Sequence, residues 1–180
     1  PAEVILQSPL NSQMQYDLGR IMYYGVTATD SQKALTAEQV GLDFSIDGAS
    51  DSYNYSSQYE DVAMLFEEVM MKYHFNIDRE LAFTDAPPAT GATCANYVVR
   101  WGVRNRIGNP LVKSRAQLIV GKVLGVADTS VYFAALPGPR SMTNGVDWCK
   151  NLSGTFANLD GVSQKTSDQP VPLRDLLPPH

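Results

Sequence analysis

The chain has 180 residues and is 44% hydrophobic, which is enough for one domain with a substantial core. Its 14 basic and 19 acidic residues give a formal net charge of −5, which argues against sequence-independent binding to nucleic acid. No apolar run approaches the roughly 20 residues of a membrane-spanning helix, so no membrane span is expected in this chain. We treat residues 1–180 as a single domain or as a fragment of one.

Two helices are predicted in the first part of the chain. The apolar residues of the first recur at helical spacing between Ser12, a capping residue, and Gly25, a residue type that commonly ends helices. The second is predicted to begin after Thr36, because Gln39 three positions later completes a capping-box pattern. It should end at Asp47, which a glycine follows.

The strongest helical pattern covers residues 58–75. Apolar side chains follow the three-and-four spacing of an α-helix at Val62, Leu65, Phe66, Val69 and Tyr73. The opposite face mixes carboxylates with apolar side chains: Glu60, Ala63, Met64, Glu67 and Met71. A helix with apolar groups on both faces tends to be buried, so this helix should be central and its inward carboxylates should need a cation.

A fourth helix should start at Pro110, a residue tolerated in the first turn, and end before Gly125. Residues 94–103 are compatible with either an extended segment or a short helix. The predicted fold is therefore mainly α, with a helical part at 10–125 and an irregular C-terminal region at 126–180. Frequent glycine and proline residues predict loops and a short hairpin in that region.

The two cysteines, Cys94 and Cys149, lie 55 positions apart with no other Cys or His at metal-ligand spacing. A structural disulfide that ties the C-terminal region to the helical part is the preferred interpretation. It would indicate an oxidising compartment, so the protein is expected to be secreted or periplasmic. Two reduced, buried thiols are the alternative.

The third predicted helix has a purely structural interpretation. Ser57 and Glu60 fit a capping box, in which the Glu60 carboxylate accepts a hydrogen bond from the backbone of the cap residue. Glu67 and Glu68 are then partners for Lys72 at helical spacing and not catalytic groups. On this interpretation the helix carries no chemistry.

A resemblance to a known family favours a different interpretation. The segment Tyr59–Glu68, with the sequence YEDVAMLFEE, resembles the Glu-Asp-x-Ala-x-x-Phe-Glu segment of gluzincin-type zinc metallopeptidases, and the tyrosine-rich stretch 51–57 before it is similar as well. The resemblance implies the helical lower part of a zincin-like domain, with Glu60 as a zinc ligand and Asp61 as a supporting group. It also implies that zinc-bound water hydrolyses a peptide bond in a peptide or protein substrate.

The sequence departs from that family at the histidine motif. His-Glu-x-x-His does not occur, and the two histidines are His74, which suits a structural role at a helix end, and the terminal His180. The remaining zinc ligands are therefore expected from a missing N-terminal half, and the 180-residue chain alone is not expected to be active. The alternative is a non-catalytic helical envelope or interaction domain in which Glu60 is a helix cap.

Three further patterns are weaker. An acid-free basic stretch favours ion pairs with the acidic helix, or a solvated face, over RNA binding: Arg100, Arg104, Arg106, Lys113 and Arg115. Two possible glycosylation motifs begin at Asn54 and Asn151. For Tyr53, Tyr55 and Tyr59, packing is favoured over stabilisation of an oxyanion.

Overall fold

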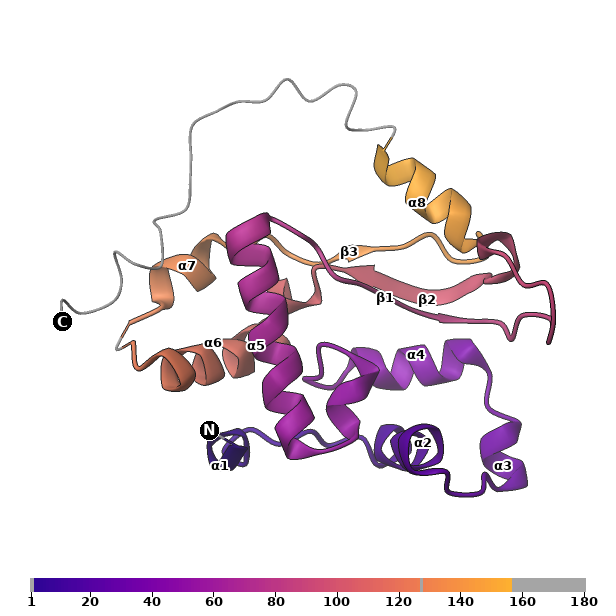
Figure 1. Ribbon diagram of the computed structural model, residues 1–180, viewed down its shortest axis with the longest axis horizontal. Helices are drawn as coiled ribbons and strands as arrows, with labels where there is room; N and C mark the ends of the chain where they lie inside the picture. The colour runs from indigo at the N-terminus through magenta and orange to yellow at the C-terminus, as the bar shows by residue number, and fades with distance from the viewer. Residues whose placement is uncertain (1, 127, 157–180) are drawn as a thin grey trace.

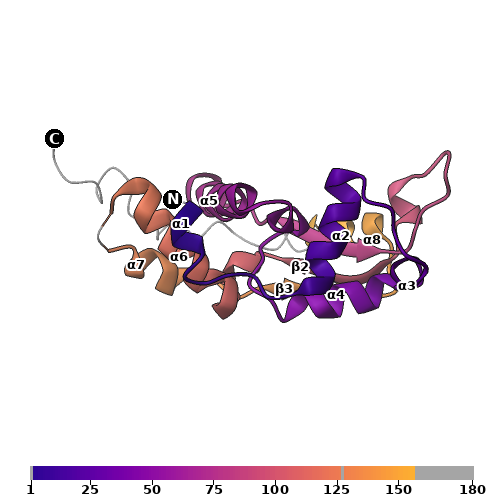
Figure 2. The same cartoon turned by 90° about the horizontal axis from the view of Figure 1, so that it is seen from below.

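The computed structural model describes residues 2–126 and 128–156, which form a mainly helical fold with a small sheet. The helices are α1 (Ala2–Ile5), α2 (Gln13–Tyr24), α3 (Asp30–Lys33), α4 (Ala37–Ser45), α5 (Gln58–Phe75), α6 (Pro110–Leu124), α7 (Ser130–Ala135) and α8 (Trp148–Phe156). The 3₁₀ helices are η1 (Ser52–Tyr55), η2 (Cys94–Asn96) and η3 (Arg106–Gly108), and the strands are β1 (Glu80–Thr84), β2 (Val99–Arg104) and β3 (Arg140–Ser141). The molecule is elongated, with α2, α3, α4 and α8 towards one end and α1, α6 and α7 towards the other (Figure 1, Figure 2).

The predicted helices begin and end close to the expected residues because their caps are formed. The Ser12 hydroxyl accepts a hydrogen bond from the backbone of α2, and Thr36 forms the predicted capping box of α4. Pro110 occupies the first turn of α6. Gly25 and Gly125 adopt the left-handed conformation, with φ of 68° and 66°, that ends α2 and α6.

The sequence pattern did not predict the sheet, although an extended segment was one of the two alternatives for residues 94–103, where most of β2 lies. Its order is β1-β2-β3 with antiparallel neighbours, so β2 is central. α4 packs across the sheet, where the ring centroid of Phe44 lies 5.4 Å from that of Phe83 and 5.5 Å from that of Trp101. Gly41 of α4 permits this approach, since an added Cβ would lie 2.3 Å from the Cβ of Trp101.

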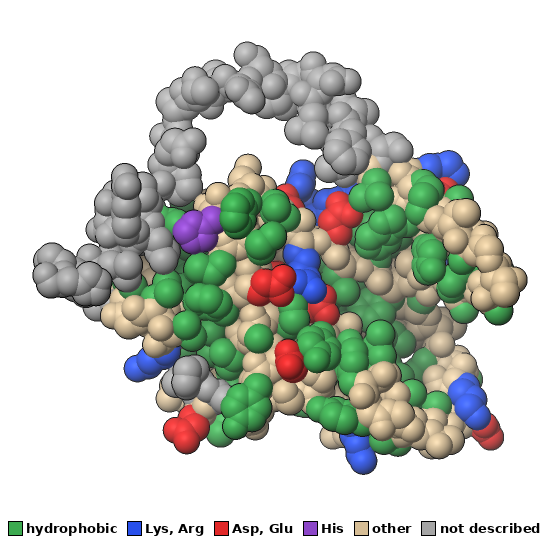
Figure 3. Space-filling view, in the orientation of Figure 1, with side chains coloured by type: hydrophobic (Ala, Val, Ile, Leu, Met, Phe, Trp, Pro, Cys, Tyr) green, Lys and Arg blue, Asp and Glu red, His purple; other side chains and the backbone are tan. Residues whose placement is uncertain are grey.

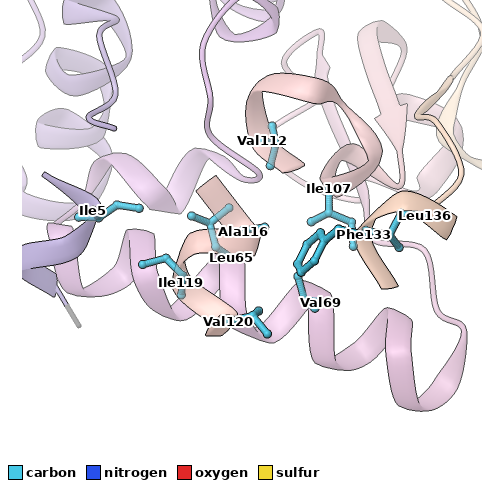
Figure 4. Packing of buried hydrophobic residues seen from close by; sticks show 10 residues of the cluster. All are labelled: Ile5, Leu65, Val69, Ile107, Val112, Ala116, Ile119, Val120, Phe133 and Leu136. Carbon is cyan, nitrogen blue, oxygen red and sulfur yellow. The ribbon is translucent and has the colours of Figure 1, made fainter. Parts of the chain in front are cut away.

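The larger hydrophobic cluster joins α5, α6 and α7 with the start of the chain. Figure 4 shows its buried side chains: Ile5, Leu65, Val69, Ile107, Val112, Ala116, Ile119, Val120, Phe133 and Leu136. Leu65 and Val69 project into this cluster from α5, where the helical spacing placed them. The helix between residues 58 and 75 is therefore central, as predicted.

A smaller cluster around Phe44 and Tyr55 packs against the sheet, and a buried arginine borders it. The guanidinium of Arg106 lies 4.3 Å from the Phe44 ring centroid and donates to the carbonyl oxygens of Ala49 at 2.6 Å and Asp47 at 2.8 Å. Burial lowers the pKa of Arg106 to about 10, which leaves it protonated at neutral pH. Arg106 of η3 therefore satisfies carbonyl groups at the end of α4 and just beyond it.

The disulfide between Cys94 and Cys149 is confirmed, and it joins η2 to α8 with Cα atoms 5.2 Å apart. The region expected to be irregular is more regular than predicted, because its described part contains α7, β3 and α8. These elements are too short for a clear periodic pattern in the sequence. Residues 157–180, including His180, lie outside the described residues. None of the helices in the described part is long and apolar enough to cross a membrane.

Candidate functional site

The orientation of α5 about its axis decides which of its carboxylates turn inward. Its buried side chains are Asp61, Met64, Leu65, Glu68, Val69 and Tyr73. Ala63 and Glu67 are exposed and Glu60 is half-buried. The inward carboxylates are thus Asp61 and Glu68, whereas the helical spacing had favoured Glu60 and Glu67. Periodicity alone misplaced them because the partners of a buried carboxylate come from other elements.

Asp61 is held by two partners at the base of α5. Arg115 of α6 forms a buried ion pair with its carboxylate and places a second nitrogen 3.2 Å from Oδ1. The side-chain amide of Asn54 donates to the same oxygen at 2.7 Å. Arg115 also donates to the carbonyl oxygens of Ser8 and Gly48, each at 2.8 Å. The network fixes the first turn of α5, which also carries Glu60.

Glu60 lies directly before Asp61 in the first turn of α5. The Glu60 backbone N–H donates to Ser57 Oγ at 3.2 Å, so Ser57 caps the helix. The reciprocal bond of a capping box is not formed, and within residues 2–126 and 128–156 the Glu60 carboxylate has no hydrogen bond or ion pair. The amino end of the helix favours its negative charge. Glu60 therefore keeps a half-buried, uncommitted carboxylate.

The described residues do not by themselves form a zinc site. A catalytic zinc ion takes three protein ligands, and in this part of the chain no three His, Cys, Asp or Glu side chains gather to hold a metal ion. His74 lies 14 positions beyond Glu60 on α5, which is about 21 Å along the helix axis, so these two side chains cannot share an ion. A zinc ion bound by Glu60 would therefore need its other ligands from outside the described residues.

A second carboxylate, Glu68, lines a small cavity that is partly open to solvent. It is 3% exposed, and neither of its oxygens has a hydrogen-bond partner among the described residues. Nε of Arg79 lies 3.5 Å from Oε1, and Arg79 also bonds to Asp51 and Glu67. Burial raises the pKa of Glu68 to about 8, although the charge of Arg79 opposes the shift. The cavity has a volume of about 100 Å³ and is lined by Glu67, Glu68, Met71, Ile77 and Arg79.

The sequence contained a signal for the burial of Glu68 that the structural interpretation overlooked. Glu68 follows Leu65 at helical spacing and precedes Val69, so it lies on the edge of the apolar stripe. Its predicted partner, Lys72, instead donates to Asp78 at 2.6 Å.

On the face of the molecule in Figure 3, acidic and basic side chains gather near the centre and hydrophobic side chains surround them.

The basic stretch does not form a solvated surface. Arg100 pairs with Asp85, and Arg104 of β2 pairs with Glu80 of β1. Two further members are buried: Arg106 and Arg115. Of the pairs predicted with the acidic helix, that of Arg115 with Asp61 is present, whereas Arg100 and Arg104 pair instead with Asp85 of the loop after β1 and with Glu80 of β1.

Both glycosylation motifs fall on buried asparagines. Asn54 is bonded to Asp61, and Asn151 donates to backbone carbonyl groups near the start of α8. A glycan on either side chain would require local unfolding. Tyr55 is also buried, and its hydroxyl donates a hydrogen bond to the Asp47 carboxylate at 2.8 Å.

Comparison with protein-family models found no match, and searches of curated proteins and of solved structures found none either. The candidate site therefore depends on the residues and geometry of this chain alone.

Proposed function

We propose that this chain is the C-terminal part of an exported, zinc-dependent peptidase in which Glu60 supplies the glutamate ligand of the metal. The resemblance of residues 59–68 to the gluzincin segment supports this proposal. The disulfide between Cys94 and Cys149 favours an oxidising compartment, secreted or periplasmic. The proposed reaction is hydrolysis of a peptide bond in a peptide or protein substrate.

The observation that carries the proposal is the uncommitted carboxylate of Glu60. A glutamate that serves as a helix cap uses its carboxylate on the backbone of the cap residue, and Glu60 does not do so among the described residues. Its neighbour Asp61 is bonded to Arg115 and Asn54, so the first turn of α5 is rigid. A ligand projecting from a rigid element is what a metal site requires. The imidazole ligands would come from a segment outside this chain.

A non-catalytic envelope or interaction domain is the second candidate. It is favoured by the lack of a complete set of metal ligands in the part of the chain that the structure describes. In such a domain the Glu60 carboxylate has no metal to bind, and its replacement would have the small effect of an ordinary surface substitution.

Zinc analysis of the longer protein, including the histidine-bearing segment that the proposal requires, separates the two candidates. Glu60→Gln keeps the size of the side chain and removes its charge. We expect this variant to bind zinc at least about tenfold more weakly than the unsubstituted protein and to lose peptidase activity. Metal content by mass spectrometry and competition with a chelator measure the affinity.

Glu67→Gln is the matched control, because Glu67 lies on the same helix and its side chain is 54% exposed. The control should bind zinc as the unsubstituted protein does. Equal zinc affinity in the Glu60 and Glu67 variants would remove Glu60 from the ligand set. A longer protein that binds no zinc before substitution would favour the non-catalytic domain.

A further inference from the structure

β1 is an edge strand of the sheet, since β2 is its neighbour and β3 lies on the far side of β2 (Figure 1). All five residues of β1 are half-buried, whereas four of the six residues of β2 are buried. Among the described elements, the main contacts of β1 are with β2 along one edge and with α4. The direction of each peptide group in β1 therefore decides which backbone N–H and C=O groups face away from β2, at the other edge of the strand.

The hydrogen bonds of β2 fix these directions. The carbonyl of Gly102 accepts a bond from the Met142 N–H at 2.9 Å, so the peptide groups of Gly102 point towards β3. Successive residues of a strand point to opposite edges, and Val103 therefore points towards β1. Its register partner Leu81 points back to β2, so the N–H and C=O groups of Ala82 point away from the sheet.

The ends of β1 give the same directions. The Asn105 N–H donates to the Arg79 carbonyl at 3.0 Å, and the Asp85 N–H donates to the Val98 carbonyl at 3.0 Å, both across to the β2 side. Alternate residues thus turn their peptide groups to the free edge: Glu80, Ala82 and Thr84. No described residue outside the sheet forms a hydrogen bond with these groups.

A shallow pocket of about 510 Å³ adjoins this edge. Ala82 and Thr84 of β1 line it, together with Tyr97 and Trp148, and no lining residue is charged. The charged side chains nearest to the edge are already paired, Glu80 with Arg104 and Asp85 with Arg100. The surface therefore offers backbone hydrogen bonds and an uncharged, partly aromatic pocket.

We propose that the free edge of β1 docks an extended, uncharged segment of another polypeptide, which adds to the sheet beside β1. An extended chain is the partner whose alternating N–H and C=O groups match this edge. Every second side chain of such a segment would point towards the pocket formed by Tyr97 and Trp148. This docking site does not require a metal ion, so it stands or fails separately from the role of Glu60.

Amide hydrogen exchange of the free protein tests the directions of the peptide groups. Ala82 should exchange rapidly, whereas Leu81 and Phe83 should be protected because their N–H groups bond to β2. Protection of Ala82 equal to that of Leu81 at all protein concentrations would overturn the proposal, since the edge would be covered. Protection of Ala82 that rises with protein concentration would assign the edge to a second copy and would also overturn it.

Selection from a phage-displayed library of random peptides of about ten residues, the upper end of natural strand lengths, tests the docking itself. Selected peptides should bind with alternate uncharged side chains and should protect Ala82 from exchange. Ala82→Pro removes an outward N–H, a change that edge strands tolerate, and should weaken binding about tenfold. Ser141→Pro is the matched control, because it removes an N–H from β3 at the opposite edge of the sheet, and it should bind the selected peptides as the unsubstituted protein does.

Circular dichroism establishes that the Ala82→Pro and Ser141→Pro variants are folded. Failure to select any binding peptide, or equal binding of the selected peptides to Ala82→Pro and Ser141→Pro, would overturn the proposal.

Discussion

At the scale of single residues, Glu68 is a carboxyl group that folding removes from water. Its side chain is buried beside a cavity, and burial raises its pKa from 4.5 to about 8. The charged groups that act on it are Arg79 before β1, Asp51 before η1, Arg106 of η3 and the adjacent Glu67. Between these two pKa values the folded protein holds a proton that the unfolded chain releases.

This proton makes the stability of the fold depend on pH. The contribution of Glu68 to the free energy of unfolding is fully present below about pH 4.5 and is lost as pH rises towards about 8. The reason is that this carboxyl ionises at a lower pH in the unfolded chain than in the folded protein, and its ionisation stabilises the unfolded chain. Glu68→Gln cannot ionise, so its free energy of unfolding should rise relative to that of the unsubstituted protein between pH 5 and pH 8, by a few kcal/mol in all. Urea unfolding across this range measures the difference.

The exposed Glu38 provides a control for this prediction. Glu38→Gln removes a carboxylate from the first turn of α4 without changing the interior, so its pH dependence should follow that of the unsubstituted protein. Curves for Glu68→Gln that run parallel to those of the unsubstituted protein at every pH would contradict the assignment of the proton to Glu68.

At the scale of elements, the buried pair of Asp61 and Arg115 joins α5 to α6. Arg115 is 2% exposed, and its Nε and one of its terminal nitrogens also donate to the carbonyl groups of Ser8 and Gly48. The pair thus connects two helices with the chain before α2 and with the loop after α4. Removing one member of such a pair leaves a charge buried without its counterion.

Asp61→Asn should therefore lower the free energy of unfolding by about 3 to 5 kcal/mol. Asp30→Asn is the matched control, because Asp30 forms an exposed ion pair with Lys33 and should change stability by less than about 0.5 kcal/mol. Chemical denaturation of both variants measures the two values. Equal, small effects in both variants would show that water replaces the partner of Arg115 at low cost.

At the scale of the whole molecule, the disulfide between Cys94 and Cys149 closes a loop that contains β2, η3, α6, α7 and β3. Closing a loop of this length restricts the unfolded chain more than it changes the native structure. Backbone contacts also hold α8, since the Trp148 N–H donates to the Tyr97 carbonyl at 3.0 Å. The native fold should therefore persist without the disulfide, with reduced stability.

The double substitution Cys94→Ser and Cys149→Ser should lower the free energy of unfolding by roughly 2 to 4 kcal/mol. Reduction of the unsubstituted protein should produce the same loss, whereas the reductant should leave the double variant unchanged. Thermal unfolding with and without reductant makes the comparison. An unchanged midpoint in the double variant would mean that the disulfide does not stabilise the fold.

Local chemistry allowed the sequence by itself to determine several features. Caps and helical spacing located α2, α4, α5 and α6, because these signals act within a few residues of the chain. The presence of two cysteines left one possible intramolecular disulfide. The uncommitted Glu60 was identified as a candidate by a local motif, and its role as a zinc ligand stays a prediction.

The tertiary structure decided which charges are buried and how the sheet forms. Asp61 and Glu68 turn inward, and Glu67 does not, because Arg115 and Arg79 reach α5 from distant parts of the chain. β1 depends on pairing with β2 and on packing against α4, so its short sequence carried no sufficient signal. The free energy of a buried charge or an edge strand is set by neighbours that folding alone brings together, and local sequence patterns do not encode those neighbours.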